Sequence, residues 1–197
     1  MSDRKSYANY VEHPRYGHQP RLTGLNPQTN FESHIFLHWH SPPSCRIDNT
    51  AIAANLEQQV AATIPVTHYY DVVRQCRDCQ QMFIFFAAEQ KYWYEELKFP
   101  LESDCIRCYP CRAKQRQIAD TLKQYEKLFH VTDRTSEQTL TMTECCLYLI
   151  ENSVFDATSK QTQRIRTLLN TIPDDPKFKH RLEKIWQRFH KIITRLS

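Results

Sequence analysis

Residues 76–111 read CRDCQQMFIFFAAEQKYWYEELKFPLESDCIRCYPC, and this stretch decides how the chain can fold. It contains five cysteines: Cys76, Cys79, Cys105, Cys108 and Cys111. Two Cys-x2-Cys pairs separated by a length of chain are the spacing of a structural zinc site, in which four thiolates occupy the corners of a tetrahedron. We therefore expect this stretch to bind one Zn²⁺ ion.

The second cysteine pair has two registers. Cys105-Ile-Arg-Cys108 and Cys108-Tyr-Pro-Cys111 both have the Cys-x2-Cys spacing, and spacing alone does not choose between them. With either register the zinc has four thiolate ligands and no open coordination position, which favours a structural ion. We predict no catalytic residue and interpret Glu89 as a carboxylate that favours the dipole of a following helix, with Gln90 hydrogen-bonded to the backbone of the cysteine turn. The chain is not expected to be an enzyme.

A resemblance to a known family extends from Val72 to about Arg116. The residues that carry it are Cys76-x2-Cys79, then Phe83-x-Phe85-x-Ala87-x-Glu89-Gln90 and Tyr92-Trp93, then Arg107-Cys108-x2-Cys111-Arg112. This pattern resembles a family of zinc-binding (zinc-ribbon) domains found in many small bacterial proteins. The family ends in Arg-Cys-x2-Cys-Arg, which implies Cys76, Cys79, Cys108 and Cys111 as the zinc ligands. It usually has glycine after the second cysteine and threonine before the alanine, where this chain has Gln80 and Phe86. The resemblance implies a bound zinc and a small ribbon, but no activity.

The segments before and after the first cysteine pair have the composition of two strands. Residues 66–75 are rich in β-branched and aromatic side chains, and residues 81–87 (QMFIFFA) are similar. We predict that they form a hairpin with the cysteine pair at its tip, followed by a helix over 87–97. Upstream, residues 51–63 (AIAANLEQQVAAT) are rich in helix formers and predict a short helix.

The N-terminal 65 residues are expected to form an extended arm with short secondary structure. The first 28 residues contain several prolines and both glycines of the chain. This composition predicts an extended segment with turns, which we expect to dock in part on the folded body. Its candidate anchors are Tyr7, Tyr10, Tyr16 and Leu22.

A short strand is predicted near residues 31–41, where three histidines lie close together. His38 and His40 alternate and would share one face of that strand. With Cys45 they suggest a second metal site, but we favour the alternative in which these side chains pack the strand on the core.

Beyond Cys111 the pattern becomes helical. Apolar residues at helical spacing predict a first helix through Ile118 and Leu128, and a capping box, Thr135-x-x-Gln138, predicts the start of a second. A third helix is expected over about 159–171 and a fourth from Pro176 to Leu196. Because the connections between these helices are short, we expect successive helices to be antiparallel neighbours. The predicted fold is thus α+β, with an arm (1–65), a zinc ribbon (66–116) and a helical domain (117–197).

Charge and composition exclude few classes of function. Lys and Arg total 26 against 22 acids, a net charge of +4, and no apolar run is long enough for a membrane span. The polar N-terminus and the eight cysteines fit a cytoplasmic metal-binding protein. We expect a protein-interaction or scaffold module that binds a protein partner or a second copy. The alternative is a nucleic-acid-binding protein that uses basic residues near the second pair and on the last helix: Arg107, Arg112, Lys114, Arg116, Lys177, Lys179, Arg181, Lys184, Arg188, Lys191 and Arg195.

Overall fold

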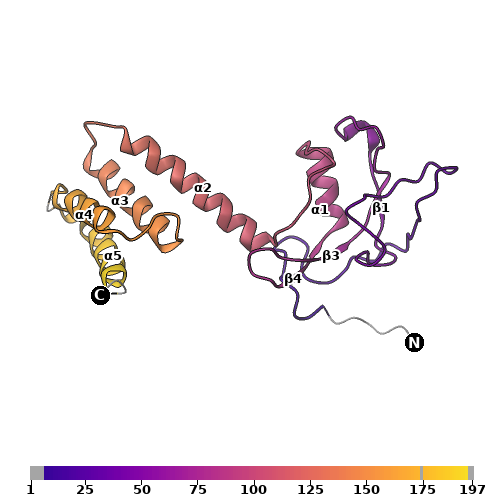
Figure 1. Ribbon diagram of the computed structural model, residues 1–197, viewed down its shortest axis with the longest axis horizontal. Coiled ribbons are helices and arrows are strands. Elements are labelled where there is room, and N and C mark those ends of the chain that lie inside the picture. Colours follow the sequence, from indigo (N-terminus) through magenta and orange to yellow (C-terminus); the bar gives the residue numbers. More distant parts are fainter. Residues whose placement is uncertain (1–6, 174, 195–197) are drawn as a thin grey trace. The chain divides into compact units, whose positions relative to one another are not determined.

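The computed structural model describes residues 7–173 and 175–194 of the chain (Figure 1). The fold consists of two units that divide between Ala113 and Lys114. The first unit holds all the strands and the second holds α-helices, so the predicted α+β class is confirmed. Among the described residues, no helix has both the length and the apolar character that crossing a membrane requires.

Two small antiparallel hairpins organise the first unit. Strand β1 (Ile52–Ala53) pairs with β2 (His68–Tyr69), and β3 (Val72–Gln75) pairs with β4 (Met82–Phe85). The β3–β4 connection contains the first cysteine pair, as predicted. A helix follows, and it matches the predicted range 87–97 closely: α1 (Ala87–Lys91) continues into the π-helical turn η2 (Tyr92–Glu96).

The helix predicted over residues 51–63 is wrong. The first residues of this segment form β1, and only the 3-10 turn η1 (Leu56–Gln58) is helical. The Gln59 side chain is instead tied to the following strand, because its amide nitrogen donates to the Val66 carbonyl at 2.6 Å and to the Tyr69 hydroxyl at 2.7 Å. Strand pairing and these tertiary hydrogen bonds override the helix propensity of the alanines.

The predicted strand over residues 66–75 is interrupted at Asp71. The Asp71 carboxylate is buried and accepts two backbone N–H groups, from Ala87 at 2.7 Å and from Arg21 at 2.8 Å. Since Phe86, the N-cap residue of α1, makes no side-chain capping bond, Asp71 caps that helix from a distant part of the chain. Burial raises the pKa of Asp71 to about 6.

The strand predicted near residues 31–41 is also wrong, and of its three histidines only His38 is buried on the core, whereas His40 is partly exposed and His34 is exposed. The segment makes only isolated bridges, such as that of Leu37 with His68. His38 is buried and stacks on Tyr94, with ring centroids 5.3 Å apart. Cys45 donates its thiol to the Pro42 carbonyl. Among the described residues, the only group of side chains suited to hold a metal is the four-cysteine cluster, so His38, His40 and Cys45 form no second site.

The N-terminal arm docks in part on the rest of the first unit, as predicted. The Val11 N–H donates to the Met82 carbonyl at 2.8 Å, which adds a short parallel bridge to β4. The Tyr16 ring lies 5.4 Å from that of Phe86. Leu22 is not an anchor, because 75% of it is exposed.

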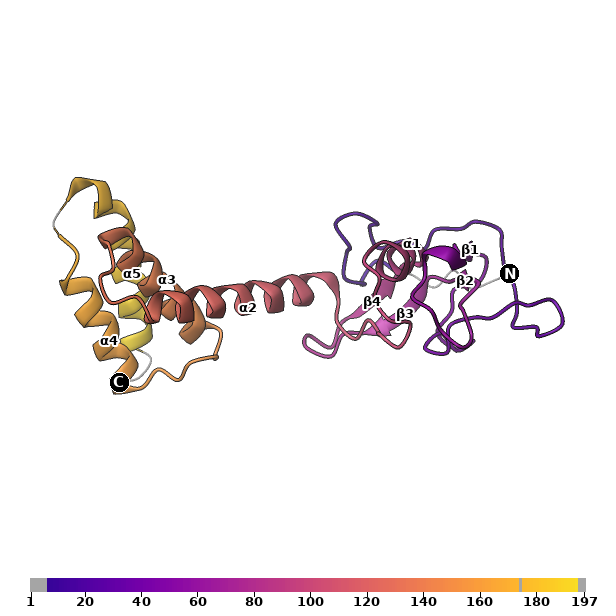
Figure 2. The ribbon, with the colours of Figure 1, turned by 90° about the horizontal axis from the view of Figure 1, so that it is seen from above.

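Four helices follow the cysteine stretch: α2 (Tyr109–Phe129), α3 (Ser136–Glu151), α4 (Ser159–Asn170) and α5 (Pro176–Ile193). The capping box predicted at Thr135 and Gln138 is present at the start of α3. Helix α3 contacts both α4 and α5 and is largely buried (Figure 2). The core of the second unit is built around Leu140, Leu147, Ile165, Ile185 and Phe189. Arg195 and Leu196, assigned to the last predicted helix, lie outside the described residues.

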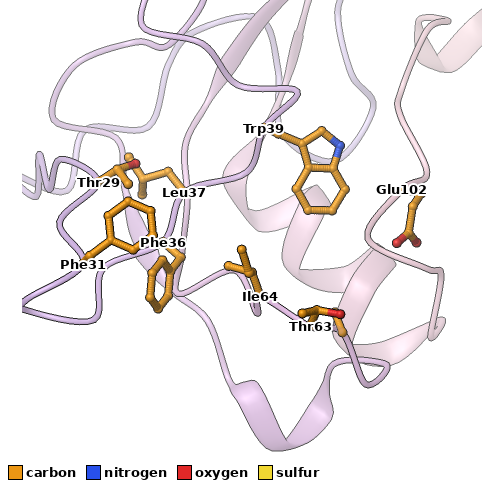
Figure 3. A pocket seen from close by; sticks show the side chains of 9 residues that line it. Thr29, Phe31, Phe36, Leu37, Trp39, Thr63, Ile64 and Glu102 are labelled. Atoms are coloured by element: carbon orange, nitrogen blue, oxygen red, sulfur yellow. The ribbon is translucent and has the colours of Figure 1, made fainter.

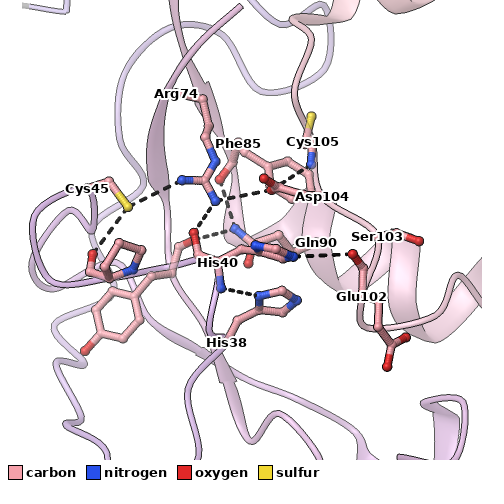
Figure 4. A network of polar contacts seen from close by, with 12 residues as sticks. His38, His40, Cys45, Arg74, Phe85, Gln90, Glu102, Ser103, Asp104 and Cys105 are labelled. Carbon is pink, nitrogen blue, oxygen red and sulfur yellow. Dashed lines mark hydrogen bonds and ion pairs between the residues drawn. The ribbon is translucent and has the colours of Figure 1, made fainter.

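His38 supplies a prediction about pH. Its Nε2 faces the Leu101 carbonyl oxygen at 2.8 Å. Its Nδ1 accepts the His40 N–H at 3.1 Å (Figure 4), so the bonded ring is neutral with its proton on Nε2. Burial lowers the pKa of His38 from 6.5 to about 4. Neutral His38 therefore contributes up to about 3 kcal/mol to the free energy of unfolding. This contribution is complete above pH 6.5 and is lost as the pH falls through 4. An NMR titration of the His38 ring, assigned with His38→Gln, should give a midpoint near pH 4; a midpoint near 6.5 would contradict this packing.

Candidate metal centre

Four cysteine sulfurs converge in the first unit. The Sγ atoms of Cys76, Cys79, Cys108 and Cys111 all lie within 4.8 Å of one another. The Cys79 and Cys108 sulfurs are 3.7 Å apart. A tetrahedral zinc with Zn–S bonds of about 2.3 Å separates its sulfurs by about 3.8 Å. The spacing and the thiol chemistry of these residues therefore fit a single tetrahedral metal ion.

The first cysteine pair lies in a tight turn at the tip of the β3–β4 hairpin. The Cys76 carbonyl accepts the Gln80 N–H at 2.9 Å, and the Cys76 N–H donates to the Gln81 carbonyl at 2.9 Å. This turn requires a left-handed backbone at Gln80, whose φ is +59°. Glycine adopts that conformation without a Cβ penalty, which explains the glycine at this place in the resembling family. In this chain the Gln80 side chain donates to the Arg77 carbonyl at 2.8 Å and stays within the turn.

The second pair lies at the beginning of α2. Cys108 immediately precedes the helix and Cys111 is in its first turn. The free N–H groups and positive dipole end of a helix favour thiolates there. The chain before α2 is tied to the first turn, because the Arg77 N–H donates to the Ile106 carbonyl at 2.9 Å and Arg107 forms an ion pair with Asp78.

The electrostatics of the cluster favour a cation. Burial opposes ionisation of Cys76, but backbone N–H groups of Cys79, Cys108 and Asp78 donate to its sulfur and lower its pKa to about 6. Burial, together with the neighbouring sulfurs, raises the pKa of Cys108 to about 11 and raises that of Cys111 as well. A divalent ion between the sulfurs supplies the positive charge that ionises the remaining thiols.

Cys105 does not join the other cysteines. Its side chain is buried, and its sulfur donates to the Arg107 carbonyl at 3.4 Å. Burial raises the pKa of this thiol to about 12, so it is a neutral core side chain at pH 7. Spacing alone leaves two registers open for the second cysteine pair. In the structure, Cys108 and Cys111 lie beside Cys76 and Cys79.

A buried ion pair supports the second cysteine pair. Glu89, in α1, is 4% exposed, and its Oε1 accepts Arg112 Nη2 at 2.6 Å and His13 Nε2 at 3.3 Å. The Arg112 guanidinium also lies 4.9 Å from the centre of the Trp93 ring. Because Arg112 directly follows Cys111, this carboxylate fixes the first turn of α2 against α1 and the N-terminal arm.

Sequence reasoning missed the partners of Glu89. It assigned this carboxylate to the helix dipole, whereas the structure pairs it with Arg112 and His13. The signal was present in the motif, since an arginine follows the last cysteine. Gln90 does bond to backbone, but not to the cysteine turn as predicted: its amide nitrogen donates to the carbonyls of Tyr70 and Phe85 at 2.5 and 3.0 Å.

The family comparison agrees with this geometry. Residues 70–120 match the model of a family described as a probable treble clef domain. A hairpin turn and the start of a helix each supply two cysteines here, so the predicted ribbon is in detail a treble clef with a four-cysteine site, suited to zinc or a similar metal. Neither the curated proteins nor the solved structures contain a match to this chain.

The Glu89–Arg112 pair is testable by a double-mutant cycle. Glu89→Gln should lower the free energy of unfolding by about 2–4 kcal/mol, because it leaves a largely buried guanidinium without its counter-charge. Arg112→Met should cost a similar amount, and the double variant should cost clearly less than the sum.

Chemical denaturation at a fixed zinc concentration measures these differences. Glu96→Gln, an exposed carboxylate of the adjoining π-helical turn, is the matched control and should change the unfolding free energy by less than about 0.5 kcal/mol. Strict additivity of the two single variants would show that the pair carries no coupling.

Proposed function

We propose that Cys76, Cys79, Cys108 and Cys111 bind one structural Zn²⁺ ion. Four thiolates leave zinc no open position for a substrate or water. The apolar packing of the first unit supports a structural role, since its described buried side chains form three small clusters rather than one core, among them Val66, Tyr69 and Tyr94 in one and Ala51 and Val72 in another. A zinc contribution of about 10–16 kcal/mol would then dominate the stability of this unit.

Metal analysis of purified variants tests the ligand set. The wild-type chain should carry about one zinc ion, Cys111→Ser should lose it, and Cys105→Ala should keep it. Cys105→Ala is the matched control because it removes a neighbouring buried thiol without adding a polar group. Zinc lost from Cys105→Ala and retained in Cys111→Ser would reverse the assignment.

We further propose that the protein is a cytoplasmic interaction or scaffold module that binds another protein. The observation that carries this proposal is a group of exposed apolar side chains in the first unit, where Phe31, Trp39 and Ile64 are each half exposed or more. They line one groove (Figure 3). Exposed apolar side chains gathered at one place are typical of protein-binding surfaces. The free cysteines and the metal cluster fit the reducing cytoplasm.

The alternative, nucleic-acid binding, has weaker support because four of its arginines have acidic partners. Arg181 pairs with both Glu137 and Glu144, and Arg188 pairs with Glu151 at 2.7 Å. Arg107 and Arg112 pair with acids of the first unit. Phosphate binding requires basic side chains that are free to replace counterions. The lysines of α5 and Lys114 and Arg116 of α2 remain as the basis of this alternative.

Binding measurements separate the two functions. Zinc-loaded protein should show no salt-dependent binding to mixed-sequence RNA or DNA. The same protein should select peptide ligands from a display library. Lys177→Glu combined with Lys184→Glu should leave peptide binding unchanged, since these are exposed lysines of the second unit. Salt-dependent nucleic-acid binding that this double variant weakens, together with no selected peptide, would favour the alternative.

A further inference from the structure

The exposed apolar side chains of the first unit line a groove of about 380 Å³. Phe31 and Phe36 lie at one end, Trp39 and Glu102 lie toward the other, and Ile64 lies between them on the floor (Figure 3). Phe31 is 72% exposed, Ile64 52% and Trp39 50%. Walls this exposed do not enclose a small molecule. They suit a side chain presented by an extended segment of another protein.

Two histidines hold the Trp39 end of the groove in shape. His38 stacks on the Trp39 indole, with ring centroids 4.6 Å apart, and bonds the Leu101 carbonyl. The His40 ring bonds the carbonyl of Glu102 at 3.3 Å. The residues on either side of Trp39 therefore fasten the segment that carries Glu102. Because this arrangement is preformed, less conformational entropy is lost when a ligand binds.

The charge of the lining identifies the ligand chemistry. Glu102 is the only charged residue of the groove, and its carboxylate makes no ion pair with any residue that the structure describes. Trp39, which is 50% exposed, lines the same end of the groove (Figure 3). A carboxylate and an indole together attract a cation, the first by its charge and the second by cation–π interaction. The other end of the groove offers only apolar and hydroxyl side chains.

We infer that this groove binds a segment of a partner protein in which an apolar side chain neighbours a lysine or arginine. The apolar side chain packs between Phe36 and Ile64, and the cation lies between Trp39 and the Glu102 carboxylate. This inference rests on the proposed interaction function, and it names the surface and the chemistry that the partner presents.

Peptide selection on the full-length, zinc-loaded chain tests the inference. The selected peptides should combine an apolar residue with a nearby Lys or Arg, and one of them, labelled with a fluorophore, serves as the probe for anisotropy measurements. Trp39→Ala should weaken its binding about tenfold or more, as expected for a central aromatic side chain. Glu102→Gln should weaken it about two- to fivefold.

A charge exchange makes the test specific. Glu102→Lys should abolish binding of the selected peptide, and a peptide with glutamate in place of its lysine or arginine should bind Glu102→Lys better than it binds the wild type. Glu12→Lys, which changes an exposed carboxylate of the docked arm, is the matched control and should leave both affinities unchanged. Zinc content and the circular dichroism spectrum identify any variant that fails to fold.

Each outcome has one meaning. Selected peptides that bind all groove variants equally would overturn the groove while leaving the interaction function in place. Selected peptides without a basic residue would overturn the inference that the ligand is cationic. The same conclusion would follow if Glu102→Lys kept the wild-type preference for the basic peptide over its glutamate version. Concentration-dependent self-association that Trp39→Ala abolishes would replace the partner with a second copy of this chain. The absence of any selected peptide would count against the interaction function and the groove together.

Discussion

The convergence of four cysteine sulfurs within 4.8 Å is the constraint on which the first unit depends. Two of the sulfurs come from a turn at the tip of a hairpin whose strands have four residues each, and two come from the start of α2. An isolated two-stranded hairpin is at best marginally stable in water. The apolar side chains of the described part of this unit form only small clusters. A metal ion held by four thiolates would join the hairpin to the helix and add the stability that a larger apolar core supplies in other domains.

Buried polar groups extend this constraint outward from the sulfurs. Glu89 connects Arg112, next to a cysteine, with His13 of the N-terminal arm. Asp71 accepts backbone N–H groups from Arg21 and from the start of α1. Both carboxylates therefore fasten segments that are far apart in the chain, Glu89 by ion pairs and Asp71 by backbone hydrogen bonds. Buried carboxylates held in this way favour a single arrangement, because another packing would leave a charge unpaired.

The same organisation supports the proposed binding of a protein over that of nucleic acid. Four arginines of the basic segments are paired with acidic residues, as Arg188 is with Glu151. Three of the exposed apolar side chains, Phe31, Trp39 and Ile64, line a groove whose one charged lining residue is Glu102. A unit held together by metal ligands and ion pairs has no need to bury every aromatic side chain, and those left exposed are available to a partner.

The sequence by itself determined the metal site, the hairpin around the first cysteine pair and the helices of the second unit. These features follow from local rules: cysteine spacing, helical periodicity and the capping box at Thr135 are all readable from neighbouring residues. Spacing left Cys105 and Cys111 as alternatives, the family resemblance implied Cys111, and the tertiary structure places Cys111 beside the other three cysteines. Only the tertiary structure paired Glu89 with Arg112 and turned residues 52–53 into a strand. Those outcomes depend on contacts between residues far apart in the chain, where a distant hydrogen bond or counter-charge outweighs local propensity.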